Sequence, residues 1–210
     1  MTPSLPVEHV VFTIGHSTHT IDRFVTLLHQ HGVTAVSDVR SVPYSRFQPQ
    51  FNREPLVEAL KRQGIAYFFL GRELGARSED KSCYENGRVQ YRRLAKTTAF
   101  RAGLARVCSE RPSHRIALMC AEREPLECHR TLLVSRELAA DGIPVLHIHE
   151  DGRLEPHPDA MKRLLRLVGL PDQDLFRSES ELIEEACASQ ERRVAYVDVQ
   201  LAREAGQGMR

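Results

Sequence analysis

The sequence predicts an α/β protein built on a mainly parallel sheet of about five strands, with helices on both faces and a C-terminal appendage. Short apolar runs alternate with segments of helical period through the first 170 residues, which is typical of βαβ units. Residues 1–170 carry 24 basic and 19 acidic side chains, whereas residues 171–210 carry 5 basic and 9 acidic ones. We therefore expect an α/β domain over 1–170 and an acidic appendage over 171–210.

The predicted strands are short apolar runs that end at glycine or at polar residues. They are residues 10–14, 35–39, 65–70, 116–119 and 145–149. The segments between them are long enough to hold helices, and parallel strands joined in this way cross over with a right hand.

Capping residues set the helix boundaries. Thr20 and Gly32 bound the first predicted helix, and Asn52 and Gly64 bound the second. Further helices are predicted at 98–110, 125–140, 160–168 and 179–189, and a candidate strand at 194–199. The polar stretch 71–91 is longer than an ordinary connection, which indicates a functional or mobile loop.

Composition limits the class of protein. Apolar residues make up 41% of the chain and charged residues 27%, values typical of a globular protein. No apolar run reaches the roughly 20 residues of a membrane helix, and residues 1–9 show no secretory signal. The five cysteines are odd in number and irregularly spaced, so we expect reduced thiols and a cytoplasmic location rather than a disulfide framework.

The predicted functional site lies where the strands end. Ligands of open α/β sheets bind at the carboxyl ends of the strands. Polar side chains that can carry chemistry follow every predicted strand here, namely His16, Ser17, Asp38, Arg40, Arg46, Arg72, Glu73, Cys120, Cys128, His129, Arg130, His149 and Glu150. Five such loops are hard to explain as solvated surface alone, so we expect them to converge on one site.

Cys120 is the candidate nucleophile. It ends an apolar strand, and a helix is predicted to begin near Pro125. A thiol beside a helix N-terminus and several arginines should have a lowered pKa and react as a thiolate. The alternative is an inert buried cysteine that packs like a small hydrophobic side chain.

Cys128, His129 and Arg130 follow in the predicted helix. Cys128 is a candidate redox partner of Cys120, and Arg130 suits an anion at the helix N-terminus. A metal bound by Cys120, Cys128 and His129 is the minor alternative. Their spacing matches no standard zinc pattern, so we expect no cofactor.

The remaining candidates divide between proton transfer and anion binding. We expect His16, Glu73 and His129 to move protons. The expected anion-binding set is Ser17, Asp38, Arg40, Arg46, Arg72 and Arg130. Alternatively, Asp38 and Arg40 pair with each other, and Glu73 forms a salt bridge.

Four motifs resemble one bacterial family, catalogued as domain of unknown function 488. They are TIGHST at 13–18, SDVRSVPYSRFQPQFN at 37–52, FLGRELGAR at 69–77 and LMCAEREPLECHR at 118–130, and the resemblance covers roughly residues 10–155. The resemblance implies a shared site rather than a particular reaction. A weaker resemblance to rhodanese domains rests on Asp38-Val39-Arg40 and Cys120, but the loop after Cys120 lacks the glycines of their anion-binding loops.

These observations lead to the expectation of an enzyme that acts on an anionic substrate, a nucleotide or nucleic-acid component. One alternative is a non-catalytic nucleic-acid-binding protein linked to DNA repair or defence, because Tyr84 and Tyr91 lie among several arginines. Another is a redox or metal sensor that uses Cys120 and Cys128. The expected partners are a small anionic substrate or nucleic acid, with no membrane and with a homodimer as an option.

Overall fold

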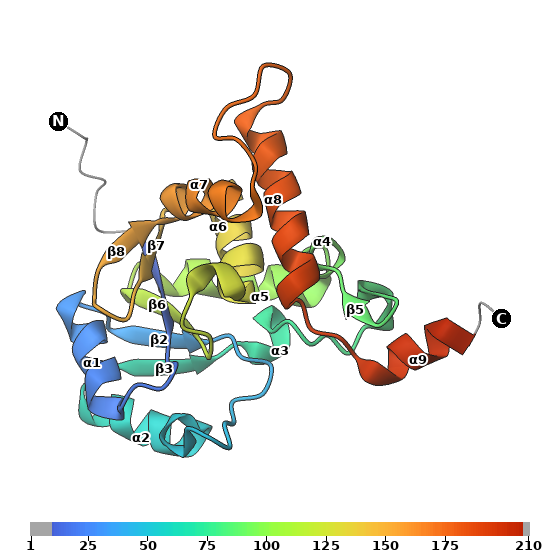
Figure 1. The fold of residues 1–210 in the computed structure, drawn as a ribbon. Helices are drawn as coiled ribbons and strands as arrows, with labels where there is room; N and C mark the ends of the chain where they lie inside the picture. Colours follow the sequence, from blue (N-terminus) through green and yellow to red (C-terminus); the bar gives the residue numbers. More distant parts are fainter. Residues whose placement is uncertain (1–9, 208–210) are drawn as a thin grey trace.

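A six-stranded sheet forms the centre of the computed structural model, which describes residues 10–207. Its order is β3 (Ala66–Phe69), β2 (Ala35–Asp38), β6 (Ile116–Cys120), β1 (Val11–Gly15), β7 (Val145–Ile148) and β8 (Leu154–Pro156). All neighbours pair in parallel except β7 and β8, which are antiparallel. The predicted α/β class and mainly parallel sheet are confirmed (Figure 1).

The three central strands bring their carboxyl ends together. Every residue of β1, β2 and β6 is buried, which explains why these strands read as continuous apolar runs. In the parallel register Gly15 pairs with Cys120, and Asp38 pairs with Met119. The predicted site residues that follow these strands therefore start from one edge of the sheet.

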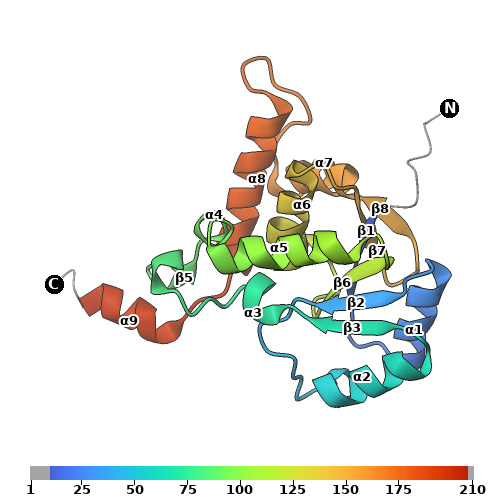
Figure 2. The same cartoon turned by 180° about the vertical axis from the view of Figure 1, so that it is seen from behind.

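Helices cover both faces of the sheet, as Figures 1 and 2 show. On one face, α1 (Ile21–Gln30) and α2 (Arg53–Arg62) bury Phe24, Leu27 and Leu56 against apolar side chains of the sheet. On the other face, α5 (Thr98–Glu110), α6 (Arg136–Ala140) and α7 (His157–Val168) belong to a second hydrophobic cluster. The sheet thus separates two cores.

The helix predicted over 125–140 is divided into three parts. A 3₁₀ turn (Pro125–Glu127) comes first, then a π-helical segment (Arg130–Ser135), and only then α6. Cys128 adopts an extended conformation with φ −133° and ψ 140°, which interrupts the helix. Cys128 and His129 therefore lie in a break between two helical segments rather than inside a regular helix.

The predicted loop over 71–91 is ordered into short elements. These are α3 (Gly71–Leu74), a 3₁₀ turn (Lys81–Cys83), the hairpin strands β4 (Tyr84–Glu85) and β5 (Arg88–Val89), and then α4 (Tyr91–Leu94). Asn86 and Gly87 have positive φ angles of 49° and 76° at the hairpin turn. Asn-Gly is the preferred pair for such a turn, and this sequence signal was missed.

The C-terminal segment differs from the expectation. The helix α8 (Glu179–Val194) continues past residue 189, and the candidate strand at 194–199 is wrong. Val197 makes only an isolated bridge with Arg88, and α9 (Val199–Gln207) follows and projects away from the sheet in Figures 1 and 2. Leu182, Ala186 and Cys187 of α8 belong to the same core as α5, α6 and α7.

The predicted caps have different outcomes. The hydroxyl of Thr20 accepts a hydrogen bond from the backbone N–H of Arg23, so this N-cap is confirmed. Asn52 occupies the N-cap position of α2, but its Oδ1 accepts from the backbone N–H of Ser45 at 2.7 Å. Asn52 therefore fastens the loop that follows β2 rather than the helix.

Two expectations concern membranes and export. Across residues 10–207, no helix combines the length and the apolar content that a bilayer span requires. Residues 1–9, on which the expectation about a secretory signal depends, lie outside the described residues.

A buried histidine pair predicts acid sensitivity. His147 Nε2 lies 3.1 Å from His157 Nδ1, and burial followed by the charge of Arg136 lowers the pKa of His157 from 6.5 to about 4. The folded state keeps His157 neutral, whereas the unfolded chain takes up a proton below pH 6.5. The contribution of His157 to the free energy of unfolding is therefore complete above pH 6.5 and is lost as the pH falls towards 4. The difference between the pKa values of His157 in the unfolded and folded states corresponds to about 3 kcal/mol.

We expect the free energy of unfolding, measured in urea, to fall by more than this amount between pH 6.5 and pH 4, because burial also lowers the pKa of His16 to about 4. His157→Asn keeps a polar atom near the position of Nδ1 but cannot become charged, so the variant should lose that part of the pH dependence. Parallel pH profiles for the two proteins would contradict the assignment.

Candidate functional site

A cleft of about 510 Å³ opens at the carboxyl edge of the sheet. Its walls come from the loops after β1, β2 and β6, from the segments near Arg77 and Tyr91, and from the C-terminal segment. The predicted site residues in its lining are His16, Arg40, Cys120 and His129. Another cavity, of about 490 Å³, lies between the β4–β5 hairpin and α8, and its lining contains no histidine or cysteine.

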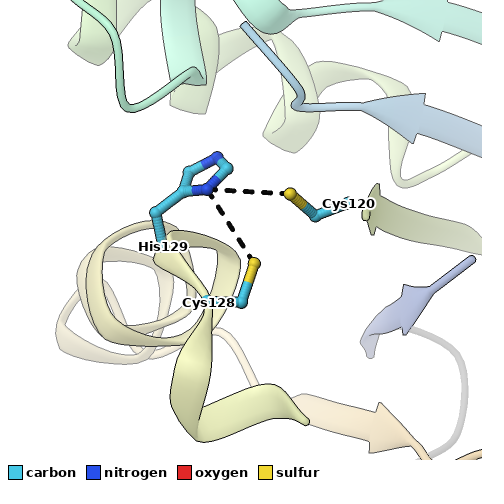
Figure 3. Close-up of side chains that lie close together, drawn as sticks. All are labelled: Cys120, Cys128 and His129. Atoms are coloured by element: carbon cyan, nitrogen blue, oxygen red, sulfur yellow. Dashed lines mark hydrogen bonds between the residues drawn. The ribbon is translucent and has the colours of Figure 1, made fainter. Parts of the chain in front are cut away.

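Cys120, Cys128 and His129 form a buried cluster, shown in Figure 3. His129 Nδ1 lies 3.7 Å from Cys120 Sγ and 3.8 Å from Cys128 Sγ, and the three atoms all lie within 4.8 Å of one another. Cys120 ends β6, whereas Cys128 and His129 come from the break between the two helical segments. We call this group the thiol–imidazole centre.

The backbone sets the orientation of the His129 ring. Its Nε2 lies 3.0 Å from the carbonyl oxygen of Val39 at the end of β2. A carbonyl oxygen can only accept a hydrogen bond, so Nε2 carries a proton and donates it. In the neutral ring, the lone pair of Nδ1 then faces both sulfur atoms.

The two thiols differ in acidity, and the difference is opposite to the sequence expectation. Burial, reinforced by the neighbouring Cys128, raises the pKa of the Cys120 thiol well above its usual value. Burial also opposes ionisation of Cys128, but the hydrogen bond from Cys120 and the charges of Arg130 and His129 together lower its pKa. The predicted low pKa of Cys120 is therefore wrong, and the thiolate of the pair lies on Cys128.

Glu122 adds a carboxyl group beside the two thiols of the centre. Its Oε2 lies 3.0 Å from Cys128 Sγ, and its side chain lines the cleft. Burial, together with the negative charge of Cys128, raises the pKa of Glu122. Two thiols and one carboxyl group thus share protons beside the imidazole of His129. Burial alone would lower the pKa of His129, but the charge and hydrogen bond of Cys128, the charge of Glu122 and the Val39 carbonyl together raise it.

Arg40 is the buried cation of the cleft. Its Nε and one terminal nitrogen donate to the Asp38 carboxylate at 2.9 and 2.7 Å, and the same terminal nitrogen also donates to the Phe51 carbonyl. Asp38 is fully buried and also accepts from the Tyr67 hydroxyl at 2.8 Å. Asp38 therefore orients Arg40 and does not itself face an anion. This is the alternative in which Asp38 and Arg40 pair with each other.

His16 lies between Arg40 and Phe51. Its ring stacks on Phe51 at 4.4 Å between centroids, and its Nδ1 lies 3.0 Å from the carbonyl of Ser17. Burial, followed by the charge of Arg40, lowers the pKa of His16 from 6.5 to about 4. At neutral pH the ring is therefore uncharged, with its proton on Nδ1, and Nε2 accepts from Arg40 at 3.3 Å.

Arg130 is not placed in the cleft. Its guanidinium is fully buried and donates to the carbonyl oxygens of Glu122 at 2.7 Å and Arg123 at 3.1 Å. These bonds hold the loop after β6 in place. The expected anion-binding role of Arg130 is therefore replaced by a role in shaping this loop.

Four further predicted site residues also lie outside the lining of the cleft. The Ser17 hydroxyl accepts from Arg123, and Arg46 is exposed with its guanidinium over the Phe47 ring. Arg72 and Glu73 line a neighbouring cavity of about 470 Å³, which shares Ser41 and Arg77 with the cleft. The loop after β3 thus contributes to an adjacent cavity rather than to the thiol–imidazole centre.

Sequence reasoning missed several residues of the cleft, namely Ser41, Arg77, Glu122, Glu127 and Tyr196. Glu122 lies two positions after Cys120, so its place in the motif was a usable signal. Tyr196 comes from the appendage and lies under the Arg77 guanidinium, with 4.7 Å between the ring centroid of Tyr196 and Cζ of Arg77. No local pattern in the sequence indicates that Tyr196 would reach this site.

Comparison with known proteins identifies a family. The family model described as "Domain of unknown function DUF488" matches residues 20–136, which is more than half of the chain. No curated protein matches, and no solved structure matches. The matched region contains Arg40, Cys120, Cys128 and His129.

A close backbone approach at Gly15 generates a prediction about the loop after β6. A Cβ atom at Gly15 would lie 1.9 Å from the carbonyl oxygen of Glu122. We expect Gly15→Ala to displace this loop and to destabilise the protein by about 1–3 kcal/mol in chemical denaturation. Gly206→Ala is the matched control, because no atom outside the neighbouring backbone of α9 lies within 4 Å of its Cβ position. Equal stability of the two variants would contradict the prediction.

The asymmetry of the two thiols generates a second prediction. In protein treated with a chelator, ultraviolet absorbance should show one thiolate forming below the reference pKa of about 8.5. Cys128→Ser should remove this step. Cys187→Ser should keep it, because burial raises the pKa of Cys187 to about 11. A low-pH step that survives in Cys128→Ser would place the thiolate on another cysteine.

Proposed function

The chain belongs to the DUF488 family, and we propose that it is an enzyme that binds a small anionic substrate in the cleft and transforms it at the thiol–imidazole centre. The observation that carries this proposal is that Cys120, His129 and the buried Arg40 line the same cavity. A reactive centre and a fixed cation in one concave site are the usual requirements for chemistry on an anion.

Arg40 supplies recognition of the anion. Asp38 engages one side of its guanidinium, while the other terminal nitrogen meets only the neutral His16 among the described side chains. That nitrogen can donate to a phosphate or carboxylate oxygen. Arg77, which also lines the cleft, adds a second positive charge.

The thiol–imidazole centre supplies the chemistry. Cys120 and His129 line the cleft, whereas Cys128 does not. Two kinds of reaction are possible here. The Cys120 sulfur can attack an electrophile once its thiol has given its proton to Nδ1 of neutral His129, 3.7 Å away, or a bound metal can activate water. Both act on an electrophile that Arg40 holds near Cys120.

The size of the cleft favours a small substrate over a nucleic-acid strand. A cavity of about 510 Å³ is in the range of small-molecule sites. The stacking surface expected from Tyr84 and Tyr91 receives little support, because Tyr91 is buried and the Tyr84 hydroxyl donates to the Ser78 carbonyl. A nucleotide or another phosphorylated small molecule therefore fits the cleft better than a polymer.

The proposal extends to the setting in which the enzyme works. All five cysteines are free, which suits a reducing compartment such as the cytoplasm. The homodimer option depends on an apolar side of the C-terminal appendage, but the apolar side of α8 packs against α7 within the same chain. We therefore propose no homodimer from that surface.

Anion binding provides the test. We expect inorganic phosphate or nucleoside monophosphates to bind the purified protein in calorimetry, and the double variant Asp38→Asn/Arg40→Gln to bind about 10- to 100-fold more weakly. The double variant avoids leaving the Asp38 carboxylate buried without its partner. Arg46→Ala, outside the cleft, is the control for general loss of positive charge. Unchanged affinity in the double variant would overturn the proposal.

A further inference from the structure

We propose that Cys120, Cys128 and His129 are the three protein ligands of a single zinc ion, with the open coordination position facing the cleft. This inference deepens the proposed function, since it names the form in which the thiol–imidazole centre works. It relies on that function only for where the substrate lies.

The distances between the ligand atoms suit a tetrahedral ion. Zinc binds thiolate sulfur at about 2.3 Å and imidazole nitrogen at about 2.0–2.1 Å, which at tetrahedral angles separates sulfur from nitrogen by roughly 3.6 Å. The observed separations from His129 Nδ1 are 3.7 Å to Cys120 Sγ and 3.8 Å to Cys128 Sγ. Both sulfur–nitrogen separations therefore match those around a tetrahedral zinc ion, and the two sulfurs lie within 4.8 Å of each other.

The imidazole already has the orientation of a metal ligand. Metal-binding histidines usually donate their second ring N–H to a carboxylate or a backbone carbonyl, which fixes the tautomer. His129 does this through Nε2 and the Val39 carbonyl at 3.0 Å, and its Nδ1 points at the two sulfurs (Figure 3).

The broken helix explains how adjacent residues become ligands of one ion. In a regular helix, neighbouring side chains diverge by about 100° and cannot meet. Here Cys128 is extended, with φ −133° and ψ 140°, while His129 is helical, with φ −60° and ψ −26°. π-helical segments of the kind that follows are often found at functional sites.

The placement of the ligands indicates a catalytic rather than a structural site. Structural zinc sites have four protein ligands, whereas catalytic sites have three and keep one position for water or substrate. Across residues 10–207, the metal-ligand group formed here contains three residues. Two of them, Cys120 and His129, line the cleft together with Arg40 and Glu122. The fourth position is therefore within reach of a substrate held by Arg40.

Metal titration of the full-length chain tests the proposal. The protein is first stripped with a chelator under reducing conditions, and zinc is then added in competition with a chromophoric chelator. We expect one zinc ion per chain, and cobalt(II) should give the visible spectrum of a tetrahedral thiolate complex. Cys128→Ala and His129→Ala should each weaken zinc binding by ~100-fold or more. Cys187→Ala, a buried cysteine outside the centre, should bind as the wild type does.

A second measurement uses only the wild-type protein, so its outcome does not depend on whether the variants fold. Alkylation of each cysteine is followed by mass spectrometry with and without zinc. We expect zinc to abolish labelling of Cys120 and Cys128 and to leave Cys108, which is half-buried elsewhere, unchanged. Absence of stoichiometric binding, or equal labelling of Cys120 with and without zinc, would overturn the inference.

Phosphate binding, measured in the stripped and in the zinc-loaded protein, separates the two proposals. Phosphate binding that depends on Arg40 without any zinc binding would remove this inference and leave the proposed function. Zinc binding by the three ligands without phosphate binding at Arg40 would overturn the proposed function and leave the zinc site in place.

Discussion

The buried guanidinium of Arg130 fixes the geometry on which the candidate site depends. It donates to the carbonyl oxygens of Glu122 and Arg123, so the loop after β6 folds back against the helix that follows. The backbone N–H groups of His16 and Ser17 add bonds to the carbonyls of Cys120 and Ala121. A loop held from two sides has one conformation, and this conformation brings Cys120 to within 4.8 Å of the ligand atoms of Cys128 and His129.

A second constraint comes from Asp38 at the end of β2. A buried carboxylate is costly unless it is paired and hydrogen-bonded, and Asp38 meets both Arg40 and the Tyr67 hydroxyl. The pair fixes the guanidinium at the edge of the cleft. The neighbouring Val39 carbonyl orients the His129 ring, so the end of one strand positions both the cation and the imidazole.

These two constraints make the proposed chemistry coherent. Arg40 and the thiol–imidazole centre belong to different loops, yet both are held by buried hydrogen bonds rather than by solvent-exposed contacts. Rigid placement of this kind is what a catalytic site needs. A zinc ion among the two sulfurs and the imidazole would use the same placement, because the Val39 carbonyl already orients the His129 ring with Nδ1 towards the sulfurs.

The sequence by itself determined the parallel strands of the sheet, the edge at which the candidate site lies and four residues of its lining, His16, Arg40, Cys120 and His129. Apolar runs such as 116–119 and the polar residues that follow them are local features, and parallel strands must end at a common edge. Only the tertiary structure decided which of these residues meet. The break at Cys128, the burial of Arg130 and the arrival of Tyr196 from the C-terminal segment depend on long-range packing. The acidity of the two thiols depends on it as well, since a pKa follows from burial and neighbouring charges that no local pattern specifies.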